Sequence, residues 1–280
     1  MIARLRGTHS PAYFNHFFLT LMTLFAIIPI AVLVLNSVKT RQEIGQSPIS
    51  LPAEIQLENY VNAWEQGGFS TTVANSLIYV GSTVFLVLSL GGLAAYALAR
   101  LDPPGGNGLM LYMLVASTIP LWLYIIPLFF LWRSVGLLNS RIGLIIIYTA
   151  FNAPFAIFLL RSFLLAVPRD LEDAARIDGA SELGVFFQVV MPIAWTGFLT
   201  VGLVVALGVW GEYQVALIMM HDPNLFPVTT SYGAFTERFG RDWALTSSAA
   251  VMMIAPIAIG ITLIYSYEAT KNIGNEITEE

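Results

Sequence analysis

Side chains that could do chemistry are scarce in this sequence, and one of them, Glu212, lies deep in an apolar segment. A charge at the centre of a bilayer costs about 2.5–3.5 kcal/mol on insertion scales, so this acid should face a cavity, a partner or a helix break. The adjacent Gly211 allows such a break. Glu212 can therefore relay protons or accept hydrogen bonds near a path through the membrane. The alternative is a neutral or paired acid that packs its helix against another chain.

Other reactive groups are absent or scattered. The chain has no cysteine, which excludes disulfides, thiolate metal sites and thiol catalysis. Its three histidines, His9, His16 and His221, have no metal-ligand spacing. Neither lysine, Lys39 or Lys271, follows a glycine, so the phosphate loop of ATPases is missing. We expect no catalytic residue, no metal site and no cofactor bound by this chain.

The composition is that of a membrane protein. Hydrophobic residues make up 56% of the 280 residues and charged residues only 11%, against about 25% in soluble domains. A net charge of −5 gives no basic face for nucleic acid. Apolar runs long enough to cross a bilayer recur along the chain. They predict an all-α fold with six transmembrane helices, at Phe17–Leu35, Val73–Ala99, Leu109–Trp132, Ile142–Leu165, Ile193–Met220 and Leu245–Tyr265.

No internal duplication is apparent, so a single transmembrane domain over residues 1–280 is expected. Six spans place both termini on one side of the membrane. Lysine and arginine residues are almost balanced between the two sides, and the positive-inside rule alone does not orient the chain. The Arg4 and Arg6 pair before the first span weakly favours cytoplasmic termini. Segments 37–71 and 221–243 would then be outer loops.

A charged segment, residues 168–192, separates the fourth and fifth spans. Pro168 suits a helix start, and Gly179 suits a left-handed helix end. Ser181 can cap a second short helix. Ala174 and Ala175 lie on a face where another protein could approach closely. The alternative is a helix that rests on the membrane surface, but such helices are usually basic on their polar face, and this one is acidic.

The spacing in this segment resembles the EAA loop of binding-protein-dependent ABC importer permeases. It has Asp173-Ala174-Ala175, then three residues, Gly179, nine residues, and Val189-Val190-Met191-Pro192. Asp173, Val189 and Met191 are conservative departures from the usual Glu, Ile and Leu. Further fragments resemble permeases of the maltose type: Leu57-Glu58-Asn59-Tyr60 with Trp64, Asn75-Ser76-Leu77, residues 94–100 (AAYALAR), Ile126-Pro127-Leu128, residues 136–140 (GLLNS), residues 154–161 (PFAIFLLR) and Trp210-Gly211-Glu212-Tyr213. The last fragment has Gly211 where the family has Asn.

This resemblance implies a permease subunit of an ATP-driven importer of sugars or related polyols, in the cytoplasmic membrane of a bacterium or archaeon. Its partners would be an ATPase that binds ATP and Mg²⁺, a second and related permease chain, and an external substrate-binding protein. The loop would be a cytoplasmic coupling element that docks the ATPase, through Leu171, Glu172, Asp173, Ala174, Ala175, Arg176, Ile177, Asp178, Gly179, Ala180 and Ser181. Candidates for the substrate path are Glu212, Trp210, Tyr213 and Asn152.

Two other classes of function are compatible with a membrane protein of this composition. In a proton-coupled secondary carrier, Glu212 would relay protons. A single buried acid without a basic partner in the spans is weak evidence for proton coupling. A purely structural membrane scaffold is the other class. Neither explains the acidic loop. Copurification of an ATPase with this chain would separate an ABC permease from both.

Overall fold

The computed structural model describes the backbone of residues 12–278 and the side chains of residues 14–262. The sequence features at Arg4, Arg6, His9 and the side chain of Lys271 lie outside this part. Over the described backbone the chain forms helices and short helical turns but no strand. It divides into two compact units, of which one is Gly68–Gly233 and the other combines the residues before and after it.

The unit Gly68–Gly233 carries the loop and Glu212. Its first helix runs without interruption from Phe69 to Leu101, as α4 (Phe69–Leu86), α5 (Gly92–Tyr96) and two π-helical turns, η1 (Val87–Gly91) and η2 (Ala97–Leu101). The helices that follow are α6 (Gly106–Thr118), α7 (Leu121–Ser134), α8 (Arg141–Leu165), α9 (Arg169–Ile177), α10 (Glu182–Val185), α11 (Met191–Ile193), α12 (Trp195–Gly211) and α13 (Gln214–Met219), with η3 (Phe186–Val190) and η4 (Pro223–Leu225).

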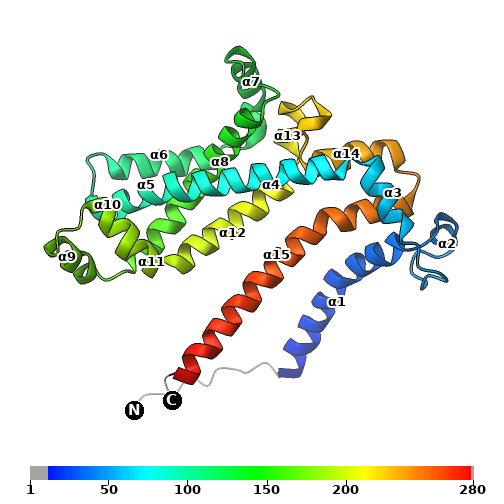
Figure 1. Cartoon of the computed structure of the whole chain (residues 1–280), viewed down its shortest axis with the longest axis horizontal. Helices are drawn as coiled ribbons and strands as arrows, with labels where there is room; N and C mark the ends of the chain where they lie inside the picture. The colour runs from blue at the N-terminus through cyan, green and yellow to red at the C-terminus, as the bar shows by residue number, and fades with distance from the viewer. Residues whose placement is uncertain (1–11, 279–280) are drawn as a thin grey trace. The chain divides into compact units, whose positions relative to one another are not determined.

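The core of this unit lies where α8 packs against α4, α5 and α12 (Figure 1). Tyr148 of α8 and Phe198 of α12 are each 2% exposed, and Leu160 is fully buried. Gly197 in α12 lies against the ring of Phe163, where a Cβ atom would clash with the ring. The helices are therefore held by close packing of apolar side chains, which is the usual basis of helix association in membranes.

The other unit contains α1 (Ala12–Ser37), α2 (Arg41–Gln46), α3 (Glu58–Gln66) and α15 (Trp243–Thr278), and α15 packs against the other three. Helix α14 (Val228–Phe239) crosses the boundary between the units. Asn59, in one of the maltose-type fragments, donates hydrogen bonds to the carbonyls of Ser37 and Lys39 at 3.1 and 2.9 Å. This amide therefore ties α3 to the end of α1.

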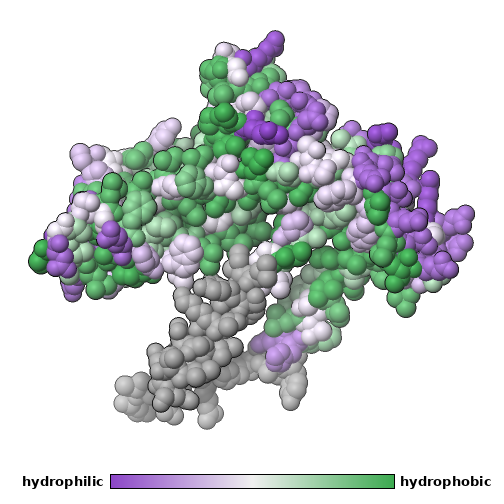
Figure 2. Space-filling model, in the orientation of Figure 1, coloured by the Kyte–Doolittle hydropathy of each residue, from purple (hydrophilic) through white to green (hydrophobic). Residues whose placement is uncertain are grey.

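Within the described residues, four helices are long and apolar enough to cross a membrane: Phe14–Ser37, Phe69–Leu101, Arg141–Leu165 and Trp243–Thr262. Two bent helix pairs raise the number to six if each pair is one span. On the visible face, hydrophobic residues cover much of the helical surface, whereas the regions of α2 and α9 carry many hydrophilic residues (Figure 2). The first, second and fourth predicted spans lie within these helices, and the sixth lies within α15.

The third and fifth predicted spans are not continuous helices. α6 and α7 meet at 99° around Ile119 and Pro120, both in extended conformation, because a proline there cannot continue a helix. The bend thus lies at Pro120, while Pro127 lies inside α7. The prediction of one helix over Ile193–Met220 is wrong, since α12 ends at Gly211 and α13 is a separate helix.

Candidate functional site

The loop between α8 and α12 contains the short helix α9 and a second helix that begins at Glu182, as predicted. This second helix consists of α10, η3 and α11 and runs to Ile193. Pro168 adopts an extended conformation directly before α9, which carries Asp170 and Glu172 in its first turn. Carboxylates there complement the positive end of the helix dipole. Gly179 has φ +89°, a left-handed conformation that favours glycine. The hydroxyl of Ser181 then accepts a hydrogen bond from the N–H of Gly184 and caps α10.

The surface of this loop combines exposed apolar and acidic side chains. Ile177 is 86% exposed, Leu171 46% and Leu183 59%. Asp173, Ala174, Asp178, Gly179 and Ser181 are also exposed, whereas Ala175, Arg176 and Ala180 are half-buried. Large apolar side chains exposed beside acids are typical of a surface that another protein covers.

Glu172, predicted to belong to the docking surface, is instead 1% exposed. Its carboxylate oxygen lies 2.7 Å from Nε of Arg100, and the Arg100 side chain is also buried. In this conformation Glu172 cannot contact a partner. It supports the loop from inside, and this pairing connects residues that are distant in sequence.

Arg176 joins the acids of the loop. Its guanidinium lies 2.9 Å from Asp173, 2.9 Å from Glu182 and 3.4 Å from Glu172. The hydrogen bond from Arg176 holds the pKa of Glu182 below its usual range, and the same bond raises the pKa of Arg176. Both groups are partly exposed, so the pair is worth less than about 1 kcal/mol on its own. Its effect is to fix α10 against α9.

Glu212 lies at the break between α12 and α13, where the sequence allowed one. One carboxylate oxygen accepts the N–H of Val215 at 2.8 Å, and the other accepts the N–H of Ala216 at 3.2 Å and the hydroxyl of Tyr148 at 2.7 Å. The hydroxyl of Thr229 donates to the carbonyl of Glu212 at 2.6 Å. The acid thus caps α13 and connects it to α8 and α14.

The structure brings only part of the predicted substrate path together. Asn152 donates from its side-chain amide to the carbonyl of Tyr148 at 2.8 Å, so Asn152 and Glu212 share Tyr148 as a neighbour. The ring of Tyr213 packs on Gly233, and Trp210 is 6% exposed. Contact of these residues with a substrate stays a prediction.

Asn75 and Asn139 of the maltose-type fragments form, together with Tyr79, a clamp that was not predicted from the sequence. The Asn75 amide donates to the carbonyls of Asn224 and Phe226, and Tyr79 donates to that of Leu225. Asn139 has φ +54° and its side-chain oxygen accepts the N–H groups of residues 221 and 222. Together they fix the segment 221–226. The feature of the sequence that could have indicated this clamp is a polar residue, such as Asn139, next to an apolar run.

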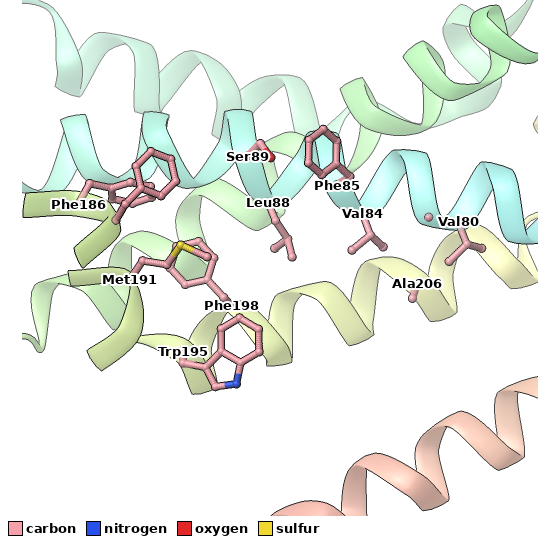
Figure 3. A pocket seen from close by; sticks show the side chains of 12 residues that line it. Val80, Val84, Phe85, Leu88, Ser89, Phe186, Met191, Trp195, Phe198 and Ala206 are labelled. Atoms are coloured by element: carbon pink, nitrogen blue, oxygen red, sulfur yellow. The ribbon is translucent and has the colours of Figure 1, made fainter. Parts of the chain in front are cut away.

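A groove of about 640 Å³ lies between α4–η1 on one side and η3, α11 and α12 on the other (Figure 3). Val84 and Leu88 point into it from one side, and Phe198 and Trp195 from the other. Apart from Ser89 and the indole of Trp195, its lining side chains are apolar. The groove therefore offers few groups that could hydrogen-bond to a polar solute.

Residues 87–270 match the family described as binding-protein-dependent transport system inner membrane component. The chain belongs to this family. It is 36% identical over 250 residues to the diacetylchitobiose uptake system permease protein NgcG of Streptomyces coelicolor, covering 89% of this chain and 83% of that one. It is 33% identical over 238 residues to the sulfoquinovosyl glycerol transport system permease protein SmoH of Agrobacterium fabrum, covering 85% and 84%.

A solved structure shares the fold of this permease. It is the crystal structure of a bacterial ABC transporter involved in the import of the acidic polysaccharide alginate, with a TM-score of 0.78 and 24% sequence identity over 95% of this chain and 99% of the other. The permease is thus a non-catalytic membrane subunit of an ATP-driven importer, and it works with an ATPase and a substrate-binding protein. The alternative of a proton-coupled carrier finds no support in these comparisons.

Proposed function

We propose that this permease forms one half of the membrane pathway of an importer for oligosaccharides or related polyols. The observation that carries the proposal is its similarity to carbohydrate permeases over most of its length, including proteins named for diacetylchitobiose and for melibiose, raffinose and stachyose. A related but different permease chain completes the pathway. ATP and Mg²⁺ bind to the ATPase and not to this chain. Four residues of this chain line the part of the pathway through which the substrate passes: Glu212, Trp210, Tyr213 and Asn152.

The loop 168–192 faces the cytoplasm and docks the ATPase, and both termini are cytoplasmic. Support comes from the exposed side chains of Leu171 and Ile177, which alternate with exposed acids on one short helix. A cleft lined by apolar and basic groups on the ATPase would complement this surface. Closure of the ATPase subunits on ATP would then move the loop.

The test is copurification of the ATPase with the permease from membranes that contain the complete transporter. Ala174→Trp adds a large side chain to the exposed face of α9, and we expect it to remove the ATPase while the permease still inserts. Ser134→Trp, at an exposed position at the end of α7, is the matched control and should retain the ATPase. Full ATPase retention by Ala174→Trp would overturn the docking proposal.

The substrate class is tested separately, by uptake of labelled disaccharides and oligosaccharides into cells that carry the whole transporter. We expect uptake to require both the ATPase and the binding protein. Uptake that persists without the ATPase, or a transporter that carries only amino acids or ions, would contradict the proposal.

A further inference from the structure

Arg100 links the docking loop to the inner end of the helix Phe69–Leu101. Its Nε atom lies 2.7 Å from a carboxylate oxygen of Glu172 in α9. Its Nη2 atom donates to the carbonyls of Leu164 and Val167, each at 2.6 Å, where α8 ends. The side chains of Arg100 and Glu172 are 4% and 2% exposed. One guanidinium therefore joins the second span, the end of the fourth span and the loop.

A second contact lies one helical turn away. The hydroxyl of Tyr96 donates to a carboxylate oxygen of Glu182 at 3.0 Å, and Glu182 is the first residue of α10. The ring of Tyr96 also packs on Phe186, with 5.2 Å between the ring centroids. Tyr96 and Arg100 are four residues apart and lie on the same helix face. The helix thus holds α10 with one residue and α9 with the other.

These contacts restrict how the loop can move. If the loop were held at one point it could pivot on the helix, whereas two attachments one turn apart, one on each short helix, fix its direction. Arg176 stiffens the arrangement because it pairs with acids of both short helices. A buried ion pair is strongly unfavourable to break on one side, since it leaves an unpaired charge in a site of low polarity.

We propose that Arg100 and Glu172 are positioning residues for coupling, and that the loop and the inner end of the helix Phe69–Leu101 move as one body when the ATPase moves. The second span then receives the motion directly, although it is not adjacent to the loop in the sequence. This inference rests on the proposed docking of the ATPase. It goes further, because it names the helix that transmits the movement and the side chains that connect it.

The test compares transport with ATP hydrolysis in proteoliposomes that contain the complete transporter. Glu172→Gln keeps the shape of the side chain and removes the charge that pairs with Arg100. We expect the ATPase to remain bound and active, and the amount of solute imported per ATP to fall roughly tenfold. Glu65→Gln, at an exposed acid of α3 outside the loop, is the matched control and should keep the wild-type ratio. An unchanged ratio in Glu172→Gln would overturn the inference.

A second measurement uses the wild-type arrangement and does not depend on that variant. The chain has no native cysteine, so spin labels can be placed at Leu90→Cys on the helix and Asp170→Cys on the loop. We expect one narrow distance distribution that is the same with and without ATP. A shift in this distance on ATP binding would overturn the inference, even if Glu172→Gln fails to assemble. Failure of the wild-type chain to retain an ATPase would instead contradict the proposed function.

Discussion

Glu212 shows how a carboxylate can lie in an apolar segment without a cation beside it. Three donors, the hydroxyl of Tyr148 and two backbone N–H groups at the start of α13, surround the two oxygens. Each of these donors satisfies an acceptor position of the side chain within the protein, which offsets the cost of removing a polar group from water. The residue ends one helix and starts the next, which gives it a structural role even in the absence of a substrate.

Replacement of Glu212 by Gln should destabilise this break. The amide group of Gln would place a donor against the N–H of Ala216 or Val215, so at least one hydrogen bond is lost. We expect a loss of about 1–3 kcal/mol, measured as a lower thermal midpoint of the detergent-solubilised permease. Tyr148→Phe removes one donor only and should cost less. If Glu212→Gln abolished uptake with no change in thermal midpoint, its main role would be contact with the solute.

The pair of Arg176 and Glu182 should make the order of the loop sensitive to acid only. The pKa of Glu182 is lowered by its bond to Arg176, so the stabilisation is complete above the unfolded value of about 4.3 and is lost as the pH falls through the lower folded value. A spin label at Ile177→Cys should therefore keep constant mobility from about pH 8 to pH 5. Glu182→Gln should show high mobility throughout. A transition of the parent near neutral pH would show that another group controls the loop.

At the scale of elements, local signals in the sequence were sufficient for the loop, and long-range pairing was not visible. Pro168, Gly179 and Ser181 act on their own neighbours, and each has the predicted backbone role. From the sequence, Glu172 is expected to be exposed like the other acids of the loop. Nothing in the residues around it indicates that it pairs with Arg100, which is 72 positions earlier in the chain. The π-helical turns and α13 were also missed, since hydropathy continues unchanged across them.

Packing of α12 against α8 should depend on Gly197. A Cβ atom at this position would collide with the ring of Phe163. Gly197→Ala should therefore reduce the free energy of unfolding by about 1–3 kcal/mol. Gly108→Ala, in the first turn of α6 and with no atom within 4 Å of the added carbon, is the control and should leave stability unchanged or slightly raised. Thermal unfolding of the two variants side by side provides the measurement, and equal midpoints would contradict this packing.

The segment 221–226 should loosen when its clamp is removed. Asn139 has a left-handed backbone, and its side chain holds the N–H groups of His221 and Asp222. Asn139→Gly loses only these bonds, about 1 kcal/mol each, whereas Asn139→Ala adds a backbone cost of about 1–2 kcal/mol. Hydrogen exchange at residues 221 and 222 should rise in both variants and most in the alanine variant. Equal exchange in all three proteins would contradict the role of the side chain.

At the scale of the whole molecule, the proposed orientation of the chain in the membrane is based on the loop and not on the distribution of charged residues. Cations are nearly balanced between the predicted sides, so a topology measurement carries the information that the sequence lacks. Ile177→Cys and His221→Cys place single thiols at exposed positions in a chain without cysteine. In right-side-out vesicles, a membrane-impermeant thiol reagent should label residue 221 and leave residue 177 unlabelled until the membrane is opened.

Addition of the ATPase makes this experiment specific for docking. The side chain of Ile177 is 86% exposed in the permease alone, so it should be labelled readily once the reagent reaches the cytoplasmic face. Bound ATPase should cover it and slow the labelling, while residue 221 reacts at the same rate with or without the ATPase. Protection of both residues would indicate a general change in the permease. Protection of residue 221 alone would show that the proposed orientation is wrong, because the ATPase would then lie on the same side of the membrane as the segment 221–226.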